Sequence, residues 1–204
     1  MRWIVVDGID GAGKNTCAHL IGDHYRSRGE EVRIITHPSD RRTGRVTRKA
    51  LLGRGRIMHA LAALSFLADM LISLREAKRL DGTVIFVRYL MATAYLPGRG
   101  AEMTYRLFRR LFPPPDHLLL VDIDPQVALS RITEREEERE MFETLPRLRR
   151  IRRRILHLAD EEWRIVDNSH SLEESRKKLK IILEEWDRDH SGRSLEGLAP
   201  FDTQ

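Results

Sequence analysis

Residues 8–16 read Gly-Ile-Asp-Gly-Ala-Gly-Lys-Asn-Thr, and they indicate the fold more clearly than any other part of the chain. It follows directly after the apolar residues 3–6 and precedes residues 17–25, whose composition indicates a helix. A strand, a glycine-rich loop, a lysine and a helix in this order are typical of a phosphate-binding loop. Backbone N–H groups must wrap a polyphosphate there, and glycine permits the backbone angles that this requires. The alternative interpretation is a glycine-rich turn that binds nothing.

Lys14 brings a full positive charge to the outer phosphates, and the start of the following helix adds the positive end of its dipole. The position after the lysine usually carries a hydroxyl that ligates Mg²⁺. Asn15 stands there instead and Thr16 follows, so Asn15 is the candidate magnesium ligand. The residues expected to contact the donor nucleotide are Gly8, Asp10, Gly11, Ala12, Gly13, Lys14, Asn15 and Thr16.

The composition limits the class of protein. A chain of 204 residues suits one α/β domain with a sizeable core. Cys17 is the single cysteine, which excludes a disulfide within the chain and favours a reducing compartment. We see no signal peptide and no uncharged apolar run of 18 residues, so we expect a soluble, cytoplasmic protein. The net charge is only +5, and nucleic-acid binding is not indicated.

Apolar runs alternate with helical patterns along the chain. The predicted strands cover residues 3–7, 31–36, 83–87, 118–123 and 163–166. The predicted helices cover residues 14–27, 45–52, 57–80, 101–112 and 172–187, with helical sequence also filling 125–160. This alternation predicts an α/β fold of the P-loop NTPase type, with a mainly parallel sheet and helices on both faces.

The helix predicted at residues 57–80 is apolar on more than one face. Leu61, Leu64, Leu71 and Leu74 do not fall on a single stripe. A helix of this kind must be covered on several sides. We therefore predict that one side packs on the sheet and the other on a second copy, giving a homodimer.

Six segments occur in an order known from one family. They are residues 8–14, 38–44, 64–69, 88–89, 121–143 and 165–169. Through them the chain resembles the thymidylate kinases over nearly its whole length. The resemblance implies a kinase that uses ATP and Mg²⁺ to phosphorylate a nucleoside monophosphate. It also implies one domain over residues 1–187 with a helical lid at about 131–150, followed by a polar tail at 188–204.

The resemblance implies roles at the phosphates and the sugar. Lys14 and the loop amides hold the donor phosphates, and Asp10 contacts the acceptor sugar. Arg41 or Arg42, together with Arg88, holds the acceptor phosphate. From the residues alone, Asp10 has an alternative role as a helix cap, and Arg88 has one in a buried structural ion pair.

Further roles fall at the base and in the lid. Phe66 stacks on the acceptor base and Tyr95 lies in the same substrate site, although Phe66 also suits a plain core position. Arg131, Arg135 or Arg139 closes over the transferred phosphoryl group. Such a set fits the chemistry, because phosphoryl transfer requires alignment, positive charge and exclusion of water.

Three departures from the family pattern fall in the acceptor site. Val87 stands where the family has an aspartate, and Met70 where an arginine reads the base edge. The segment 88–95 is one residue shorter. We expect Val87 to limit the chemistry unless Asp7 or Asp122 supplies the missing carboxylate. The alternative function is an ATP-binding protein with lost or redirected kinase activity, serving as a regulator or acting on another small acceptor.

Residues 147–154 contain six arginines, while apolar residues keep helical spacing through the run. We interpret the arginines mainly as a solvated face that pairs with acidic residues at 134–143. A phosphate or nucleic-acid site is the alternative. The eight histidines show no spacing typical of zinc sites.

Overall fold

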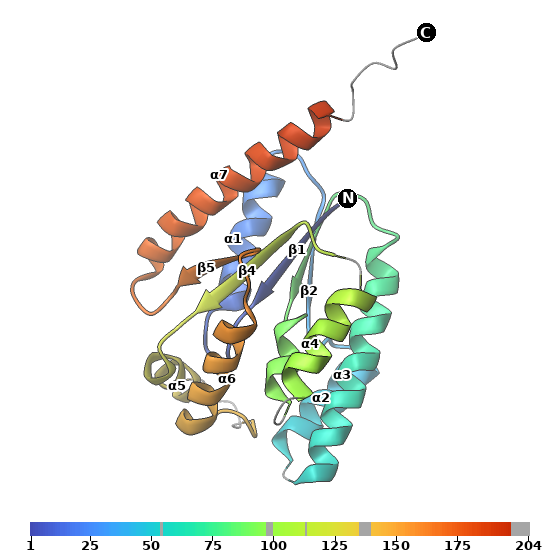
Figure 1. The fold of residues 1–204 in the computed structure, drawn as a ribbon, viewed down its shortest axis with the longest axis vertical. Coiled ribbons are helices and arrows are strands. Elements are labelled where there is room, and N and C mark those ends of the chain that lie inside the picture. Colours follow the sequence, from blue (N-terminus) through green and yellow to red (C-terminus); the bar gives the residue numbers. More distant parts are fainter. Residues whose placement is uncertain (54, 97–99, 113, 135–139, 197–204) are drawn as a thin grey trace.

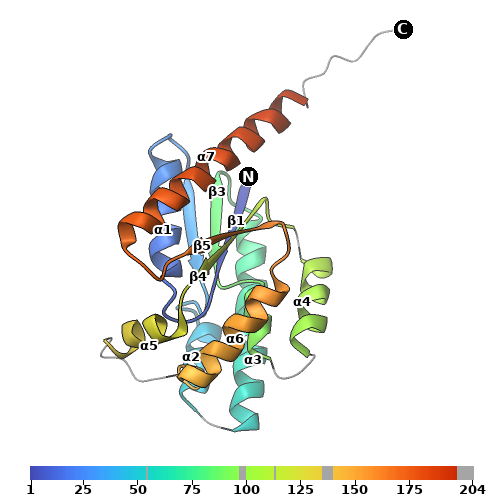
Figure 2. The same cartoon turned by 60° about the vertical axis from the view of Figure 1, so that its left-hand side comes forward.

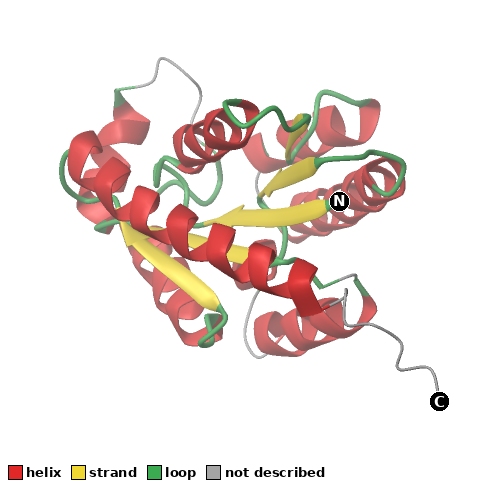
Figure 3. Cartoon of the chain, turned by 90° about the horizontal axis from the view of Figure 1, so that it is seen from above, coloured by secondary structure: helices red, strands yellow, loops and turns green. Residues whose placement is uncertain are grey.

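The computed structural model describes residues 1–53, 55–96, 100–112, 114–134 and 140–196, without the side chains of 56 and 190–196. Five parallel strands form one sheet in the order β2-β3-β1-β4-β5. They are β1 (Arg2–Asp7), β2 (Val32–Thr36), β3 (Thr83–Val87), β4 (His117–Asp122) and β5 (Trp163–Asp167). Figure 1 shows the strands running through the middle of the molecule, and Figure 3 shows helices on both sides of them. The predicted α/β fold with a parallel sheet is confirmed.

Seven α-helices and one 3-10 helix are found among the described residues. They are α1 (Lys14–Arg26), α2 (Arg42–Leu52), α3 (Arg56–Ala77), η1 (Met91–Tyr95), α4 (Gly100–Leu111), α5 (Pro125–Thr133), α6 (Leu145–Leu158) and α7 (Leu172–Glu196). Helices α1 and α7 cover one face of the sheet, while α3, α4 and α6 lie on the other (Figure 2). Residues 2–7 and 83–87 are buried throughout because both faces of these strands are covered.

Two predicted boundaries differ from the structure. Residues 188–196, expected in a polar tail, continue α7 to Glu196. The helical sequence expected up to residue 160 is divided, because α5 ends at Thr133 and α6 begins only at Leu145. Pro146 takes one of the first positions of α6, where its missing N–H is no loss.

The carboxyl ends of the strands determine where a ligand can bind. Residues 8–13 link β1, the central strand, to α1. Arg88 follows β3 on one side of β1, and Asp122 ends β4 on the other. In sheets of this type the ligand site lies at this edge, beside the central strand.

One side of α3 remains uncovered. Ile57 is 78% exposed and Leu64 68%, and Leu61 and Leu71 are also exposed. The window Ile57–Ala77 has a mean hydropathy of 1.9, enough by length and composition to cross a membrane, with 28% of it buried. Single helices of soluble proteins pass the same test, so this finding alone does not indicate a membrane.

Candidate active site

The loop between β1 and α1 requires its glycines. Gly11 has φ 77° and Gly13 φ 88°, values that favour glycine. A Cβ atom on Gly11 would lie 2.6 Å from the carbonyl oxygen of Ala128. A Cβ on Gly13 would lie 2.5 Å from Nδ2 of Asn168. The loop is therefore a tight cradle of backbone.

Lys14 is held above this loop. Its Nζ donates a hydrogen bond to the carbonyl oxygen of Ile9 at 2.6 Å and lies 4.0 Å from Oδ1 of Asp10. Asn15 and Thr16 are exposed at the start of α1. Lys14, Asn15 and Thr16 border an open cleft of about 580 Å³, which also reaches Gly11 and Gly13. The cleft therefore combines a cation, exposed side-chain oxygens and a glycine loop, the groups that phosphates and Mg²⁺ bind.

The segment after β5 supports the loop from behind. Asn168 Nδ2 donates to the carbonyl oxygen of Ala12 at 2.7 Å. Arg131, from α5, donates to the carbonyl oxygen of Asn168 at 3.0 Å. Arg131 thus lies beside the phosphate loop, whereas Arg135 and Arg139 lie outside the described residues.

A second cavity of about 280 Å³ opens beside the cleft. Its lining is mostly apolar and includes Phe66, Leu67 and Phe108. The two cavities share Pro38, Arg88 and Glu140, so they meet at these residues. An elongated ligand with an apolar part and a phosphate part fits such a pair of spaces.

Asp10, Arg88 and Tyr95 form a polar cluster in the wall of the apolar cavity. Arg88 donates to Oδ1 of Asp10, and the Tyr95 hydroxyl donates to Oδ2 at 3.0 Å. Burial and the charge of Asp10 raise the pKa of Tyr95 well above its ordinary value. Arg88 has φ 63°, a conformation rare for residues other than glycine and typical of functional sites. The alternative role of Asp10 as a helix cap is not seen, since Gly13 is the N-cap residue of α1 and no side chain caps the helix.

Glu140 lies at the junction of the two cavities. Burial raises its pKa to about 7, although the positive charge of Arg88 lowers it in part. Phe142, two residues on, packs edge-to-face on Tyr95 with 5.0 Å between ring centroids. Apart from its place two residues before Phe142, Glu140 had no feature in the sequence that indicated a role.

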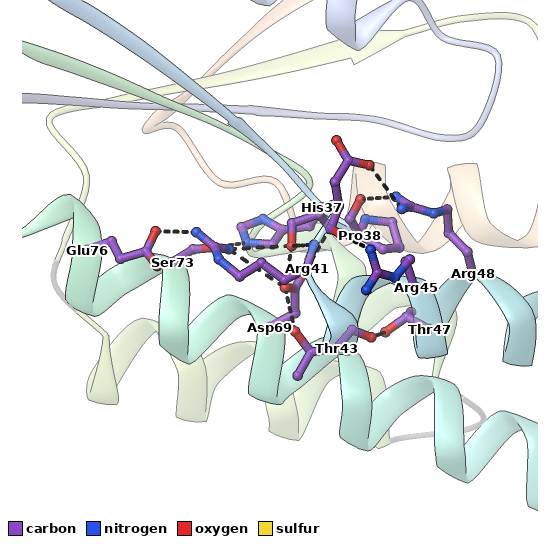
Figure 4. A network of polar contacts seen from close by, with 12 residues as sticks. His37, Pro38, Arg41, Thr43, Arg45, Thr47, Arg48, Asp69, Ser73 and Glu76 are labelled. Carbon is purple, nitrogen blue, oxygen red and sulfur yellow. Dashed lines mark hydrogen bonds and ion pairs between the residues drawn. The ribbon is translucent and has the colours of Figure 1, made fainter.

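The loop after β2 is fixed to α3 by a polar network (Figure 4). Asp69 is fully buried and accepts hydrogen bonds from the N–H of Ser39 at 2.7 Å and from its hydroxyl at 2.5 Å. The Thr43 hydroxyl donates to Asp69 at 2.8 Å. His37 contacts Ser73 at 2.9 Å, and burial lowers the pKa of His37 to about 4, so it is neutral at pH 7.

This network directs the arginines of the loop differently from our prediction. Arg41 turns toward α3, where it pairs with Glu76 and donates to Ser73. Arg42 is exposed at the start of α2, and neither arginine borders the two cavities. Arg48 does border the phosphate cleft and donates to the carbonyl oxygen of Pro38 at 2.9 Å. The sequence could not single out Arg48, because the loop geometry decides which arginine of the series faces the cleft.

Asp7 and Asp122, the carboxylates expected to replace the aspartate missing at position 87, already accept hydrogen bonds from other groups. Asp7 is buried and accepts hydrogen bonds from the N–H groups of Tyr89 and Met91 at 3.0–3.2 Å. Asp122 forms a bidentate pair with Arg152, both contacts being 2.7 Å. Val87 itself is fully buried in the core and borders neither cavity.

Two other expectations concern side chains near these sites. Met70 is fully buried in the main core and does not line the apolar cavity. The arginine run on α6 is mainly a solvated face, as predicted, since Arg147, Arg149, Arg150 and Arg153 are exposed. Arg152 and Arg154 make contacts inside the molecule, with Asp122 and with the carbonyl oxygens of Ala94 and Leu96.

Comparison with known proteins agrees with this geometry. A family model described as thymidylate kinase matches residues 6–179. The chain belongs to the thymidylate kinase family. A relative described as a probable thymidylate kinase, from Archaeoglobus fulgidus, is 32% identical over 190 residues, covering 90% of this chain and 95% of the relative. A thymidylate kinase from Leptospira borgpetersenii is 29% identical over 195 residues, covering 91% and 95%.

The fold of this chain is also similar to that of a solved thymidylate kinase. The solved structure of thymidylate kinase from Candida albicans superposes with a TM-score of 0.67 at 19% identity, covering 90% of this chain and 92% of that one. Membership of the thymidylate kinase family makes this chain an ATP-dependent phosphotransferase. The predicted resemblance is therefore confirmed.

Proposed function

We propose that the protein transfers the γ-phosphoryl group of ATP to a nucleoside monophosphate, with thymidine monophosphate as the first acceptor to test. The observation that carries this proposal is the meeting of a phosphate cleft and an apolar cavity at Arg88 and Glu140. Donor and acceptor phosphates would approach each other there, as an in-line transfer requires.

The donor fits the cleft at the glycine loop. Lys14 can exchange its hydrogen bond with the Ile9 carbonyl for one with a phosphate oxygen. Asn15 and Thr16 offer the side-chain oxygens that would hold Mg²⁺, which in such sites keeps few protein ligands and takes the rest from phosphates and water. Bound Mg²⁺ supplies neutralising charge at the phosphates.

The acceptor fits the apolar cavity. Its base would lie beside Phe66, and its sugar near Asp10 and Tyr95. Arg88 and Arg48 both border the phosphate cleft and are the cations best placed for the acceptor phosphate. Arg131 extends beside the loop from the other side, where a closing lid would carry it toward the donor.

These residues act by position and charge. Lys14, Arg48 and Arg88 hold two polyanions that otherwise repel each other. The negative charge that spreads over the transferred group is stabilised by the same cations. Closure of residues 140–144 with α6 over the cavities would exclude water from the reaction.

We also propose that the protein is a cytoplasmic homodimer formed through α3. The support is the exposed apolar side of this helix, where Ile57, Leu61, Leu64 and Leu71 remain uncovered. A twofold contact covers such a surface with the fewest distinct interactions.

The test of the transfer function is Lys14→Met. A charge-assisted hydrogen bond contributes about 1.5–3 kcal/mol, so ATP affinity measured by titration calorimetry should fall roughly 10- to 150-fold. Lys178→Met, an exposed lysine on α7, is the matched control and should bind as wild type. Unchanged ATP binding and ADP release in Lys14→Met would refute the donor site.

A second candidate function is nucleotide binding without efficient transfer. Two features favour it: Asn15 replaces the usual hydroxyl, and Val87 offers no carboxylate at the cleft. ATP binding by calorimetry without ADP release on any nucleoside monophosphate would select this second function.

A further inference from the structure

The apolar cavity is lined by one polar cluster and by mainly apolar side chains. In the polar cluster, Arg88 and Tyr95 both donate hydrogen bonds to Asp10. The remaining lining is mainly aliphatic and aromatic, from α3, α4 and η1. Among the described residues that line this cavity, Arg88 is the only cation, and none is a lysine, asparagine or glutamine. Within the part of the lining that the structure describes, no amide and no cation other than Arg88 is therefore available to read a base.

Three other polar side chains in the lining, Thr47, Thr93 and His59, use their hydrogens locally. Thr47 donates to the carbonyl oxygen of Thr43 at 3.1 Å, and Thr93 to that of Leu90 at 2.9 Å. His59 contacts the carbonyl oxygen of Gly55 through Nδ1 at 2.8 Å, and this nitrogen must be the donor because a carbonyl only accepts. These groups therefore have no free hydrogen to give to a base.

The pyrimidine bases thymine and cytosine present different hydrogen-bonding groups to such a site. Thymine presents a carbonyl acceptor at position 4 and a donor at N3, whereas cytosine presents an amino donor and an acceptor. A site built to hydrogen-bond one pattern rejects the other by roughly 10⁴-fold or more, because buried polar groups are left unpaired. An apolar pocket of suitable size discriminates between near-isosteric ligands by only about 100-fold or less.

We propose that the acceptor site selects its base by size and stacking rather than by hydrogen bonds to the base edge, so that deoxynucleoside monophosphates of cytosine and of thymine are both substrates. The inference rests on the proposed function, since it concerns the acceptor of that reaction. Stacking falls to Phe66, which lines the cavity on α3, and to Phe142, which lines it from the segment before α6. Binding by these rings is tolerant of the base because every base has a π face.

The first experiment compares kcat/KM for dTMP, dUMP and dCMP in a coupled ADP-release assay. The ratio of dTMP to dCMP should stay below about 100. Loss of the methyl group in dUMP should reduce kcat/KM only about fourfold, the worth of one buried methyl group. A ratio of dTMP to dCMP above 100 would overturn the inference.

A binding measurement separates this inference from the proposed transfer. Titration calorimetry with dTMP and dCMP in the absence of ATP reports the acceptor site alone. If neither nucleotide is phosphorylated but their Kd values agree within 100-fold, transfer to either nucleotide is refuted, while selection of the base by size and stacking stands. If neither nucleotide binds, both are overturned.

A variant tests the one hydroxyl that remains. Thr104 on α4 lines the cavity, and its hydroxyl makes no hydrogen bond with the described residues. Thr104→Val removes the hydroxyl at nearly constant shape, and the dTMP to dCMP ratio should change less than fivefold. Met103→Leu, a 72% exposed neighbour on the same helix, is the matched control. A larger change in Thr104→Val alone would show that this hydroxyl reads the base edge.

Discussion

Asp69→Asn is expected to destabilise the protein strongly, although the side chain keeps its size. The carboxylate is 0% exposed and accepts three hydrogen bonds, two from Ser39 and one from Thr43. Asparagine replaces one acceptor with an NH₂ donor. With its oxygen facing the two hydroxyls, its NH₂ group faces the N–H of Ser39, and that bond is lost.

The magnitude follows from these contacts. An unsatisfied buried donor costs about 1–3 kcal/mol. The two hydroxyl bonds weaken from bonds to a charged acceptor to bonds to a neutral one, which costs about 1 kcal/mol each. The expected loss in free energy of unfolding is therefore about 3–5 kcal/mol, a large part of the roughly 5–15 kcal/mol typical of a domain.

The assay is urea unfolding at pH 7, with the free energy extrapolated to water. Burial alone would raise the pKa of Asp69, but hydrogen bonds from Ser39 and Thr43 lower it below 3.8. The unfolded state therefore binds the proton more readily, and the stabilisation is present above pH 3.8 and lost as the pH falls through the lower, folded value. The difference between wild type and variant should thus stay constant from pH 8 to 5 and narrow only below pH 3.8.

Glu76→Gln is the matched control, because Glu76 belongs to the same network but its side chain is 52% exposed. Exposed ion pairs contribute about 0–1 kcal/mol, so this variant should lose little. A loss below about 1 kcal/mol in Asp69→Asn, or an equal loss in Glu76→Gln, would refute the reasoning.

Three further predictions follow from other contacts. Arg48→Ala should raise the KM for the acceptor while leaving the KM for ATP within about twofold, whereas Arg45→Ala, which borders neither cavity, should change neither in steady-state assays. Burial raises the pKa of Glu140 to about 7, so between pH 4.5 and 7 the folded state binds this proton more tightly than the unfolded state, and the protein loses stability as the pH rises. Glu140→Gln should therefore raise the melting temperature more at pH 8 than at pH 5. An equal gain at both pH values would contradict this. Leu71→Asp should give monomers in sedimentation experiments, while Ile181→Asp, a 58% exposed position on α7, should leave the dimer intact.

The order of the strands and helices followed from local sequence. The run at residues 8–16 predicts a strand, a phosphate loop and a helix, and φ values of 77° and 88° at Gly11 and Gly13 show why only glycine suits the loop. Apolar runs such as residues 118–121 predict buried strands, since both faces of a parallel sheet are covered. These features depend on near neighbours, and sequence alone determined them.

The local sequence did not predict where α7 ends, nor the break between α5 and α6. Residues 188–196 are mostly polar, and composition alone cannot tell a polar helix from a polar tail. Whether residues 140–144 interrupt the helical pattern depends on where they lie, and Met141 is placed by the hydrogen bond from its N–H to the Leu51 carbonyl on α2. Contacts across about 90 residues of chain have no signal in a local pattern.

The acceptor site shows the same division most clearly. Sequence supplied Asp10, Phe66, Arg88 and Tyr95, which tertiary structure places around one cavity. It could not decide that Arg41 turns to Glu76 while Arg48 faces the cleft, because that choice depends on Asp69 holding the loop from another helix. Residue type and spacing determine what chemistry a chain can perform, and only packing between distant segments determines which of several like charges meets the substrate.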